Sequence, residues 1–363
     1  MRRLGISIYP ARSTFEQDQA YLDLAHQYGY SRVFTSLLEI NGDQTAVIKR
    51  FKQVIAYANT LGFKVIIDMN PRLFKQLGVS YDDLHFFDQL GVWGIRLDEG
   101  FTGMEEARMT RNPYGLKIEI NMSAGTHYLD NIMTYSPQRD NLLGCHNFYP
   151  QRYTGLGTPF LIKWSRLFRK YGLHTAAFVN APTATFGPWP VQDGLPTLEQ
   201  DRDLPIAAQV KHLLLTDLID DVIIGNAYAK EEDLKAAAEA FFAKRPSLNV
   251  ILNQETTVLE RQAILENVHL YRGDYSEYVL RDTQTRVKYR DEDFSAHDNH
   301  GTIKAGDLII VNNDYGQYKG ELQIARCEFA NDGRRNVVGH LAPAEAFLLA
   351  YLQPWSTFEL KRA

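Results

Sequence analysis

Short apolar runs alternate with longer amphipathic stretches along the first two thirds of the chain. The clearest run is Val65-Ile66-Ile67, which has the composition of a buried strand. Stretches such as 14–29 and 43–61 carry apolar residues three and four positions apart, which predicts helices. This pattern predicts eight strands, over residues 4–9, 32–37, 64–70, 94–98, 117–121, 142–147, 174–179 and 222–226.

Each predicted strand is followed by a helical pattern, and the last of these covers residues 230–244. Eight such units in succession predict an α/β fold of the (β/α)8 TIM-barrel type. A doubly wound open sheet produces the same alternation, but such sheets more often stop at about five or six strands. A proline-rich segment over 182–205 separates the last two strands and predicts a long loop over the barrel mouth.

Near residue 246 the alternation of apolar runs and amphipathic stretches ends. Strand-like segments over 277–281, 307–312 and 321–327 are separated by turn signals such as Asp332-Gly333. A single helical stretch over 343–351 precedes a last strand. We therefore predict two domains, a catalytic barrel over 1–245 and a smaller, mostly β domain over 246–363 that is itself a small barrel.

Composition and charge exclude several classes of protein. The chain has 363 residues, is 45% hydrophobic and carries a formal net charge of −5 with scattered basic residues, so no nucleic-acid partner is expected. No apolar run is long enough for a membrane span, and the amino terminus lacks a secretory signal pattern. The two cysteines, Cys145 and Cys327, suggest neither a disulfide framework nor a zinc site. A cytoplasmic location is the resulting expectation.

Polar residues gather at the carboxyl ends of the predicted strands, where barrel enzymes place their chemistry. Because side chains alternate along a strand, residues of one parity face the barrel interior. Five strands showing polar residues at these positions predict a polar pocket. Its expected members are Ser7, Tyr9, Asp68, Asn70, Arg96, Asp98, Lys117, Glu119, Asn121 and His146, with Asn147 beside it.

The carboxylates among these residues suit acid–base chemistry, above all glycoside cleavage, in which two carboxyl groups share the work. The candidate catalytic residues are Asp98, Glu99 and Glu119. A metal-dependent lyase or isomerase acting on a phosphorylated sugar is the alternative, since oxygen ligands also hold Mg²⁺ or Mn²⁺. However, His146 is the only histidine at a strand end, and Cys145 points opposite to it. The glycosidase hypothesis needs neither a cofactor nor a metal ion.

A second stretch, 145–157, runs from a strand end into a glycine-bearing turn. Thr154 and the amides from Gly155 to Gly157 are candidates for binding an anion at the start of the next helix, with Arg152 adding a fork of donors. A plain helix cap is the alternative interpretation. Arg12 and Arg72 are further candidates for an anionic substrate group.

Three motifs, 5–10, 96–100 and 146–150, together resemble a bacterial family once called outer surface proteins and now linked to 6-phospho-N-acetylmuramidase activity. The stretch 312–322 resembles that family's second, cyclophilin-like domain. The resemblance implies a cytoplasmic glycosidase of cell-wall recycling. Its substrate would be the small molecule in which 6-phospho-N-acetylmuramic acid is β-1,4-linked to N-acetylglucosamine. A non-catalytic carbohydrate-binding protein is the third possibility.

The adjacent carboxylates Asp98 and Glu99 also resemble a pair found in glycosidases in which the substrate's own acetamido group attacks the sugar carbon. In those enzymes the aspartate orients the acetamido group and the glutamate protonates the leaving oxygen. Gly100 is expected to let Glu99 swing over the mouth. A conventional pair, with Glu119 or Asp68 as the second carboxylate, remains open. Polar loops of the second domain are expected to close one side of the pocket.

Overall fold

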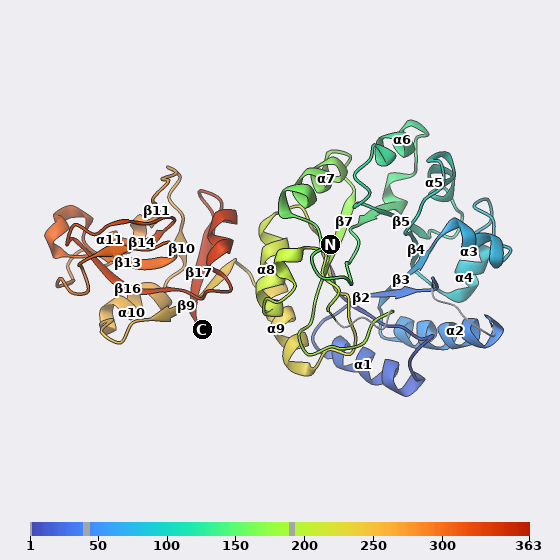
Figure 1. Cartoon of the computed structure of the whole chain (residues 1–363), viewed down its shortest axis with the longest axis horizontal. Helices are drawn as coiled ribbons and strands as arrows, with labels where there is room; N and C mark the ends of the chain where they lie inside the picture. Colours follow the sequence, from blue (N-terminus) through green and yellow to red (C-terminus); the bar gives the residue numbers. More distant parts are fainter. Residues whose placement is uncertain (1, 39–43, 189–192) are drawn as a thin grey trace. The chain divides into compact units, whose positions relative to one another are not determined.

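The computed structural model describes residues 2–38, 44–188 and 193–363, and the chain forms two compact units, Met1–Phe241 and Phe242–Ala363 (Figure 1). The first residue of the helix predicted over 43–61, and residues 189–192 of the loop predicted over the mouth, lie outside the described residues. No helix in the described ranges has both the length and the apolar character needed to cross a membrane.

The first unit is a closed barrel of eight parallel strands in sequence order, which confirms the predicted fold class. Figure 1 looks along this barrel, with the helices outside the ring of strands. The strands are β1 (Leu4–Ser7), β2 (Arg32–Ser36), β3 (Lys64–Met69), β4 (Gly94–Leu97), β5 (Lys117–Asn121), β6 (Leu142–Cys145), β7 (His174–Val179) and β8 (Asp221–Ile224).

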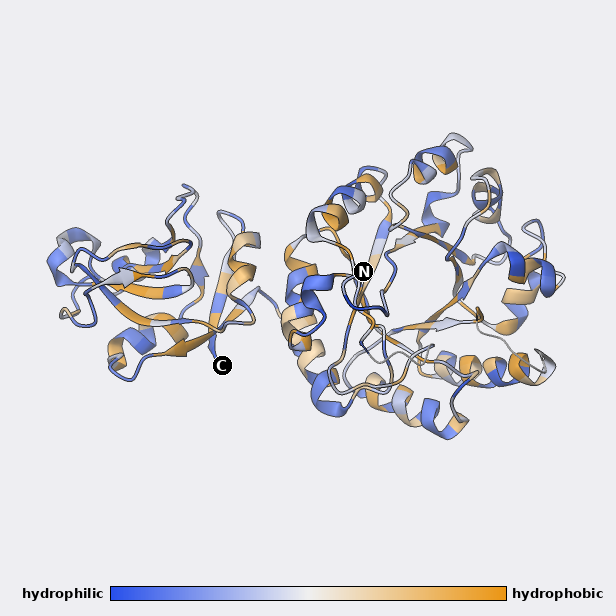
Figure 2. Ribbon diagram, viewed as in Figure 1, coloured by the Kyte–Doolittle hydropathy of each residue, from blue (hydrophilic) through white to orange (hydrophobic). Residues whose placement is uncertain are grey.

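Helices follow the strands as the apolar spacing predicts. They are α1 (Phe15–Gln27), α2 (Gln44–Thr60), α3 (Pro71–Gln76), α4 (His85–Leu90), α5 (Met104–Met109), α6 (Tyr128–Thr134), α7 (Thr158–Lys170), α8 (Ile206–Leu215) and α9 (Glu231–Phe241), with 3-10 turns η1 (Arg139–Asn141) and η2 (Glu199–Asp201). Helix α1 starts at a capping box between Thr14 and Gln17, and it buries Tyr21, Leu22 and Ala25. Figure 2 shows such helices with orange and blue faces around apolar strands (Figure 2).

Three charged residues meet inside the barrel. Arg32 of β2 donates to Glu119 of β5, and its other terminal nitrogen donates to Asp221 of β8 at 2.7 Å. All three side chains are fully buried. Because β2, β5 and β8 are not neighbours in the barrel, these groups can meet only across its interior. We call these three residues the interior ion cluster. It occupies part of the barrel interior that apolar side chains usually fill.

The second unit is built on a seven-stranded mixed sheet in the order β10-β17-β9-β16-β13-β14-β11, with a separate pair β12-β15, as expected for a mostly β domain. The strands are β9 (Ser247–Leu252), β10 (His269–Leu270), β11 (Val279–Asp282), β12 (Thr302–Ile303), β13 (Asp307–Val311), β14 (Leu322–Ala325), β15 (Phe329–Ala330), β16 (Arg335–Leu341) and β17 (Thr357–Arg362).

The helices of the second unit differ from the prediction of one helical stretch. The structure contains α10 (Val258–Leu265) and α11 (Thr283–Lys288), while the predicted stretch is the 3-10 turn η4 (Ala346–Tyr351). A further 3-10 turn, η3, spans Asn313–Tyr318. Helix α10 has a capping box in which Thr257 and Glu260 exchange hydrogen bonds. A threonine followed three residues later by a glutamate is a recognised start signal for a helix. The strand-like pattern of the surrounding sequence led the prediction to miss it.

Candidate active site

Arg96 is the centre of the polar group at the carboxyl ends of the strands. Its Nη1 donates to Asp68 Oδ1 at 2.7 Å and lies 3.4 Å from Asp98 Oδ1, and its Nη2 donates to Asn147 Oδ1. The register of β3 and β4 places Asp68 directly beside Arg96. The structure therefore brings together four predicted site residues from three strand ends, β3, β4 and β6.

The carboxyl group of Asp68 has an unusual proton affinity. Burial raises the pKa of Asp68 to about 7; the nearby charges of Asp98 and Glu119 add to this, and the Arg96 guanidinium opposes it. Its side chain is 6% exposed, so water contributes little to stabilising the charged form. Asp68 can therefore hold or release a proton near neutral pH, which is a property of groups in acid–base sites.

This raised pKa predicts a pH-dependent stability. The folded state keeps a proton on Asp68 up to a pKa of about 7, whereas an unfolded chain releases it at about 3.9. The stability due to this group is therefore fully present below about pH 4 and is lost as the pH rises through about 7. We expect Asp68→Asn to cost more stability at pH 5 than at pH 8, by about 1–3 kcal/mol. Urea unfolding at both pH values measures this, and an equal cost at both would contradict it.

Asp98 and Glu99 lie in the turn that follows β4. The Asp98 amide donates to Met69 O at 3.0 Å, and the Asn121 side chain donates to Asp98 O at 3.2 Å. The Asp98 side chain is 37% exposed, which leaves it accessible to a substrate. Glu99 is exposed, and within the described part of the chain its carboxylate has no hydrogen-bond or ion-pair partner. The pair thus combines one anchored carboxylate with one that can move.

The rest of this turn is fixed by Glu106, which the sequence analysis missed. Its buried carboxylate accepts from the amides of Phe101 and Gly103 and from the Tyr128 hydroxyl. Gly100 does not have a positive φ, so its place in this turn does not depend on the left-handed conformation that glycine allows. A Cβ there would lie 1.8 Å from the Tyr128 hydroxyl oxygen, so glycine is needed for space. The acidic pair Glu105-Glu106 at a helix start was the signal available in the sequence.

The prediction that His146 faces the pocket was wrong. His146 is fully buried and its two ring nitrogens lie 3.0 Å from Ser123 Oγ and 2.9 Å from Ser165 Oγ of α7. A Cβ on Gly144 would meet Phe168 of α7, so even-numbered residues of β6 face the helices and Cys145 faces the interior. Burial and the charge of Arg96 lower the pKa of His146 to about 3, so the ring is neutral. It links β6 to α7.

Glu119 points into the barrel interior, as its parity predicts, but it is fully buried there. Although Glu119 stands beside Arg96 in the β4–β5 register, its carboxylate turns to Arg32 in the interior ion cluster. Lys117 leaves the group altogether, because its ammonium binds Asp140 O and Asn141 Oδ1 at the other end of the barrel. The sequence shows Arg32 at the start of an apolar strand, but it does not show which carboxylates this arginine binds.

The turn predicted to bind an anion does so, but the anion belongs to the protein. The amides of Tyr153 and Gly155 donate to the two oxygens of Glu199 at 2.7 and 2.8 Å. Arg202 donates to the same carboxylate through Nε and Nη2, and together these hydrogen bonds lower the pKa of Glu199 to about 2. Thr154 donates to Gln151 O. The turn therefore anchors η2, and the assignment of Thr154 and Gly155 to a substrate anion is corrected.

Four further candidates have structural partners as well, whereas Arg72 is exposed and has no hydrogen-bond or ion-pair partner among the described residues. Ser7 Oγ donates to Ile224 O at 2.7 Å and ties β1 to β8, and the Tyr9 hydroxyl donates to Gly225 O and ties the segments that follow these strands. Asn70 caps α3 by accepting from the Leu73 amide at 2.9 Å. Arg152 forms an ion pair with Asp203 in which the two side chains are 37% and 71% exposed. Of these four, Arg152 alone keeps an accessible charge.

Both units match models of one protein family. Residues 4–239 match the amino-terminal domain of 6-phospho-N-acetylmuramidase, and residues 246–361 match its carboxyl-terminal domain. The chain belongs to the 6-phospho-N-acetylmuramidase family. This agrees with the resemblance found in its motifs, and it supports a glycoside hydrolase role for this member. The expected substrate class is accordingly a small phosphosugar.

Two solved structures are similar over the whole length of this family member. An uncharacterized protein from B. cereus is 45% identical with a TM-score of 0.90, and the match covers 99% of each chain. A conserved protein of unknown function from Enterococcus faecalis is 25% identical with a TM-score of 0.75, and the match covers 99% of this chain and 96% of that one. No curated protein matches the sequence.

Proposed function

We propose that this protein hydrolyses the β-1,4 bond between 6-phospho-N-acetylmuramic acid and N-acetylglucosamine, as a cytoplasmic step of peptidoglycan recycling. The observation that carries the proposal is the family match over both units, together with an accessible carboxylate pair, Asp98 and Glu99, at the end of β4. Catalytic groups at the carboxyl end of a barrel strand are the usual arrangement in this fold.

In the proposed mechanism the acetamido oxygen of the muramic acid attacks the anomeric carbon as the bond to the leaving oxygen breaks. Asp98 accepts a hydrogen bond from the acetamido N–H and stabilises the positive charge that develops on that group. Glu99 gives its proton to the leaving oxygen. Glu99 then takes a proton from the water that opens the cyclic intermediate, so that the enzyme returns to its starting state.

The surroundings of Asp98 suit this role. Its backbone is held from two neighbouring strands, by Met69 O and by the Asn121 side chain, and its carboxylate lies near Arg96. A positioned carboxylate costs little to orient when the substrate binds. Glu99 has no such constraint and can approach the leaving oxygen. The alternative carboxylates are less accessible to a substrate, because Glu119 is fully buried against Arg32 and the Asp68 side chain is only 6% exposed.

A direct assay tests the proposal. The purified full chain should release N-acetylglucosamine from the phosphorylated disaccharide, and activity should survive treatment with a chelator and dialysis. Loss of activity with the chelator and its return with Mg²⁺ would favour a metal-dependent reaction instead. Absence of turnover, with tight binding of the disaccharide, would favour a carbohydrate-binding protein. Fractionation of cells that express the protein tests the cytoplasmic location.

Arg152 is our candidate for the 6-phosphate, since its guanidinium is accessible and paired only with exposed Asp203 among the described residues. We predict that Arg152→Ala raises KM for the phosphorylated disaccharide by about 10- to 150-fold, the equivalent of roughly 1.5–3 kcal/mol for a charge-assisted hydrogen bond. Steady-state kinetics measure this. The unphosphorylated disaccharide is the matched control substrate, and its KM should not change. Equal increases for both substrates would exclude a phosphate-specific role.

A further inference from the structure

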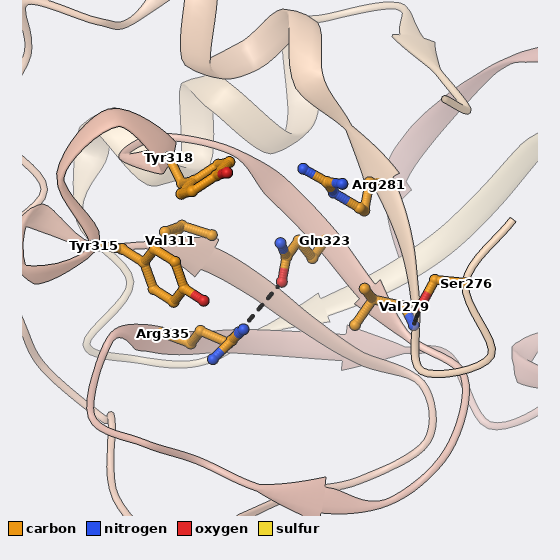
Figure 3. A pocket seen from close by; sticks show the side chains of 8 residues that line it. All are labelled: Ser276, Val279, Arg281, Val311, Tyr315, Tyr318, Gln323 and Arg335. Atoms are coloured by element: carbon orange, nitrogen blue, oxygen red, sulfur yellow. Dashed lines mark hydrogen bonds between the residues drawn. The ribbon is translucent and has the colours of Figure 1, made fainter. Parts of the chain in front are cut away.

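The second unit contains a hollow of its own, which the proposed reaction does not use. It has a volume of about 330 Å³ and is lined by two arginines, two tyrosines, Gln323 and Ser276, with Val279 and Val311 at its apolar edges (Figure 3). The arginines are Arg281 and Arg335, and the tyrosines are Tyr315 and Tyr318. We call it the arginine–tyrosine hollow. Its size is near the lower end of the range for small-molecule sites, roughly 300–1,000 Å³.

The hollow lies over one face of the sheet. Arg281 of β11 stands opposite Gln323 of β14, which in turn stands opposite Ile309 of β13. Arg335 stands opposite Val311 at the end of the β13–β16 pair. Further along the same face, Ile309, Ala325 and Ile303 form a small apolar cluster. The face is therefore sealed by apolar packing at one end and carries polar side chains at the other.

A fully buried carboxylate holds the polar end in place. Glu321 accepts from Arg281 Nε at 2.7 Å and from Arg281 Nη2 at 3.0 Å, a bidentate geometry. It also accepts from Gln323 Nε2 at 2.9 Å, and Gln323 Oε1 accepts from Arg335 Nε at 3.4 Å. Glu321 thus orients Arg281 directly and contributes to orienting Arg335 through Gln323, while Asp332 Oδ1 accepts from Arg335 Nη1 at 2.9 Å. Figure 3 shows both guanidinium groups beside Gln323.

Donors remain after these bonds are made. Among the described residues, Arg281 Nη1, Arg335 Nη2 and the hydroxyls of Tyr315 and Tyr318 have no protein partner. No carboxylate is among the described lining residues, although Glu321 pairs with Arg281 and Asp332 pairs with Arg335 at 2.9 Å. An adjoining hollow of about 530 Å³ shares Arg281 and Tyr318 and adds further arginines, again without a carboxylate in its lining. Such a surplus of cationic donors favours an anion.

The two tyrosine rings add aromatic surface to the hollow. Their centroids are 5.4 Å apart at an interplanar angle of 80°. Arg334 and Arg335 lie 4.1 and 5.1 Å from the Tyr315 centroid, and Arg286 lies 5.2 Å from that of Tyr318, so cations pack on both rings. Rings that are fixed in this way lose little freedom when a ligand packs on them. Both tyrosines are half-buried, and the ring surface that the guanidinium groups leave uncovered lies beside the donors, where it can pack against a sugar ring.

We propose that the arginine–tyrosine hollow binds a small anionic sugar, whose phosphate or carboxylate accepts from Arg281 and Arg335 and whose ring packs against Tyr315 and Tyr318. This binding site belongs to the second unit alone. It gives that unit a ligand of its own, in addition to the substrate of the barrel.

Isothermal titration calorimetry on the full chain tests the proposal with four probes. These are N-acetylglucosamine 6-phosphate, N-acetylmuramic acid, neutral N-acetylglucosamine and inorganic phosphate. We expect binding by at least one of the two anionic sugars, and the stronger one identifies the preferred anion. Arg335→Ala should weaken or abolish one binding component by at least about tenfold, as for the loss of one charge-assisted hydrogen bond. Tyr315→Ala should weaken the same component.

Arg362→Ala is the matched control, since it removes an exposed arginine of the same unit that does not line the hollow. We avoid replacing Arg281, because this would leave the buried Glu321 without its main partner. Thermal unfolding confirms that each variant is folded, and Tyr318→Phe provides a milder second variant. Unchanged isotherms in Arg335→Ala and Tyr315→Ala would overturn the proposal. So would equal affinity for neutral N-acetylglucosamine, or for inorganic phosphate alone.

Discussion

Replacing Glu99 by Gln is expected to lower kcat for the phosphorylated disaccharide by about 10²–10⁴-fold, the range for loss of a general acid. Glutamine has nearly the same shape but cannot give a proton to the leaving oxygen. The exposed position of Glu99 means that the substitution should leave the fold intact. Initial rates on the natural disaccharide and an unchanged unfolding temperature together provide the measurement.

Two comparisons make this prediction specific. A substrate with a good leaving group needs little protonation, so Glu99→Gln should impair it much less, whereas Asp98→Asn should impair both substrates. Glu105→Gln is the matched control, because it makes the same charge change in the first turn of α5, the next helix, at a residue whose carboxylate binds only Thr102 among the described hydrogen-bond partners. A Glu99→Gln enzyme with near-parent activity would sink the assignment, and Asp68 and Glu119 would then be the carboxylates to test.

Replacing Arg32 by Met should be the most destabilising single change in the barrel that we predict. It would leave the fully buried Glu119 and Asp221 without the cation that both now bind. Removing one partner of a buried ion pair costs about 3–5 kcal/mol, because an uncompensated charge stays behind. Burial raises the pKa of Asp221, but the bonds to His174 and Arg32 lower it by more, so the net effect is a lowered pKa. The charged form of this carboxylate therefore depends on its cationic partners. Denaturant unfolding of the barrel unit measures the loss.

Arg2→Met is the control for this prediction. Arg2 pairs with Asp217 at 3.0 Å, but the two side chains are 42% and 87% exposed. Exposed pairs contribute about 0–1 kcal/mol, since water and salt screen them. Similar small losses for Arg2→Met and Arg32→Met would mean that the interior ion cluster is compensated in another way. Rescue of Arg32→Met by the added substitutions Glu119→Leu and Asp221→Leu would support the proposed cause.

The sequence by itself determined the order and type of the barrel elements. Strands covered on both faces read as apolar runs such as 65–67, and helices read from apolar residues three and four apart. Both signals depend only on residues that are close together in the sequence, so they can be recognised without knowledge of the fold. The same holds for Asp68, Arg96 and Asp98, because charges at the end of an apolar strand are informative wherever the strand lies.

Tertiary structure alone decided which of these residues face a substrate. Strand β6 and the residue after it read Leu-Leu-Gly-Cys-His, in which apolar residues occupy both parities. Only the packing of Gly144 and His146 against α7 shows that Cys145 faces inward and His146 outward. Glu119 finds Arg32, and the 153–155 turn finds Glu199, at separations of 87 residues for the first pair and 44 to 46 for the second. A charged side chain takes the nearest opposite charge in space, and that neighbour comes from the folded arrangement of strands rather than from the local pattern.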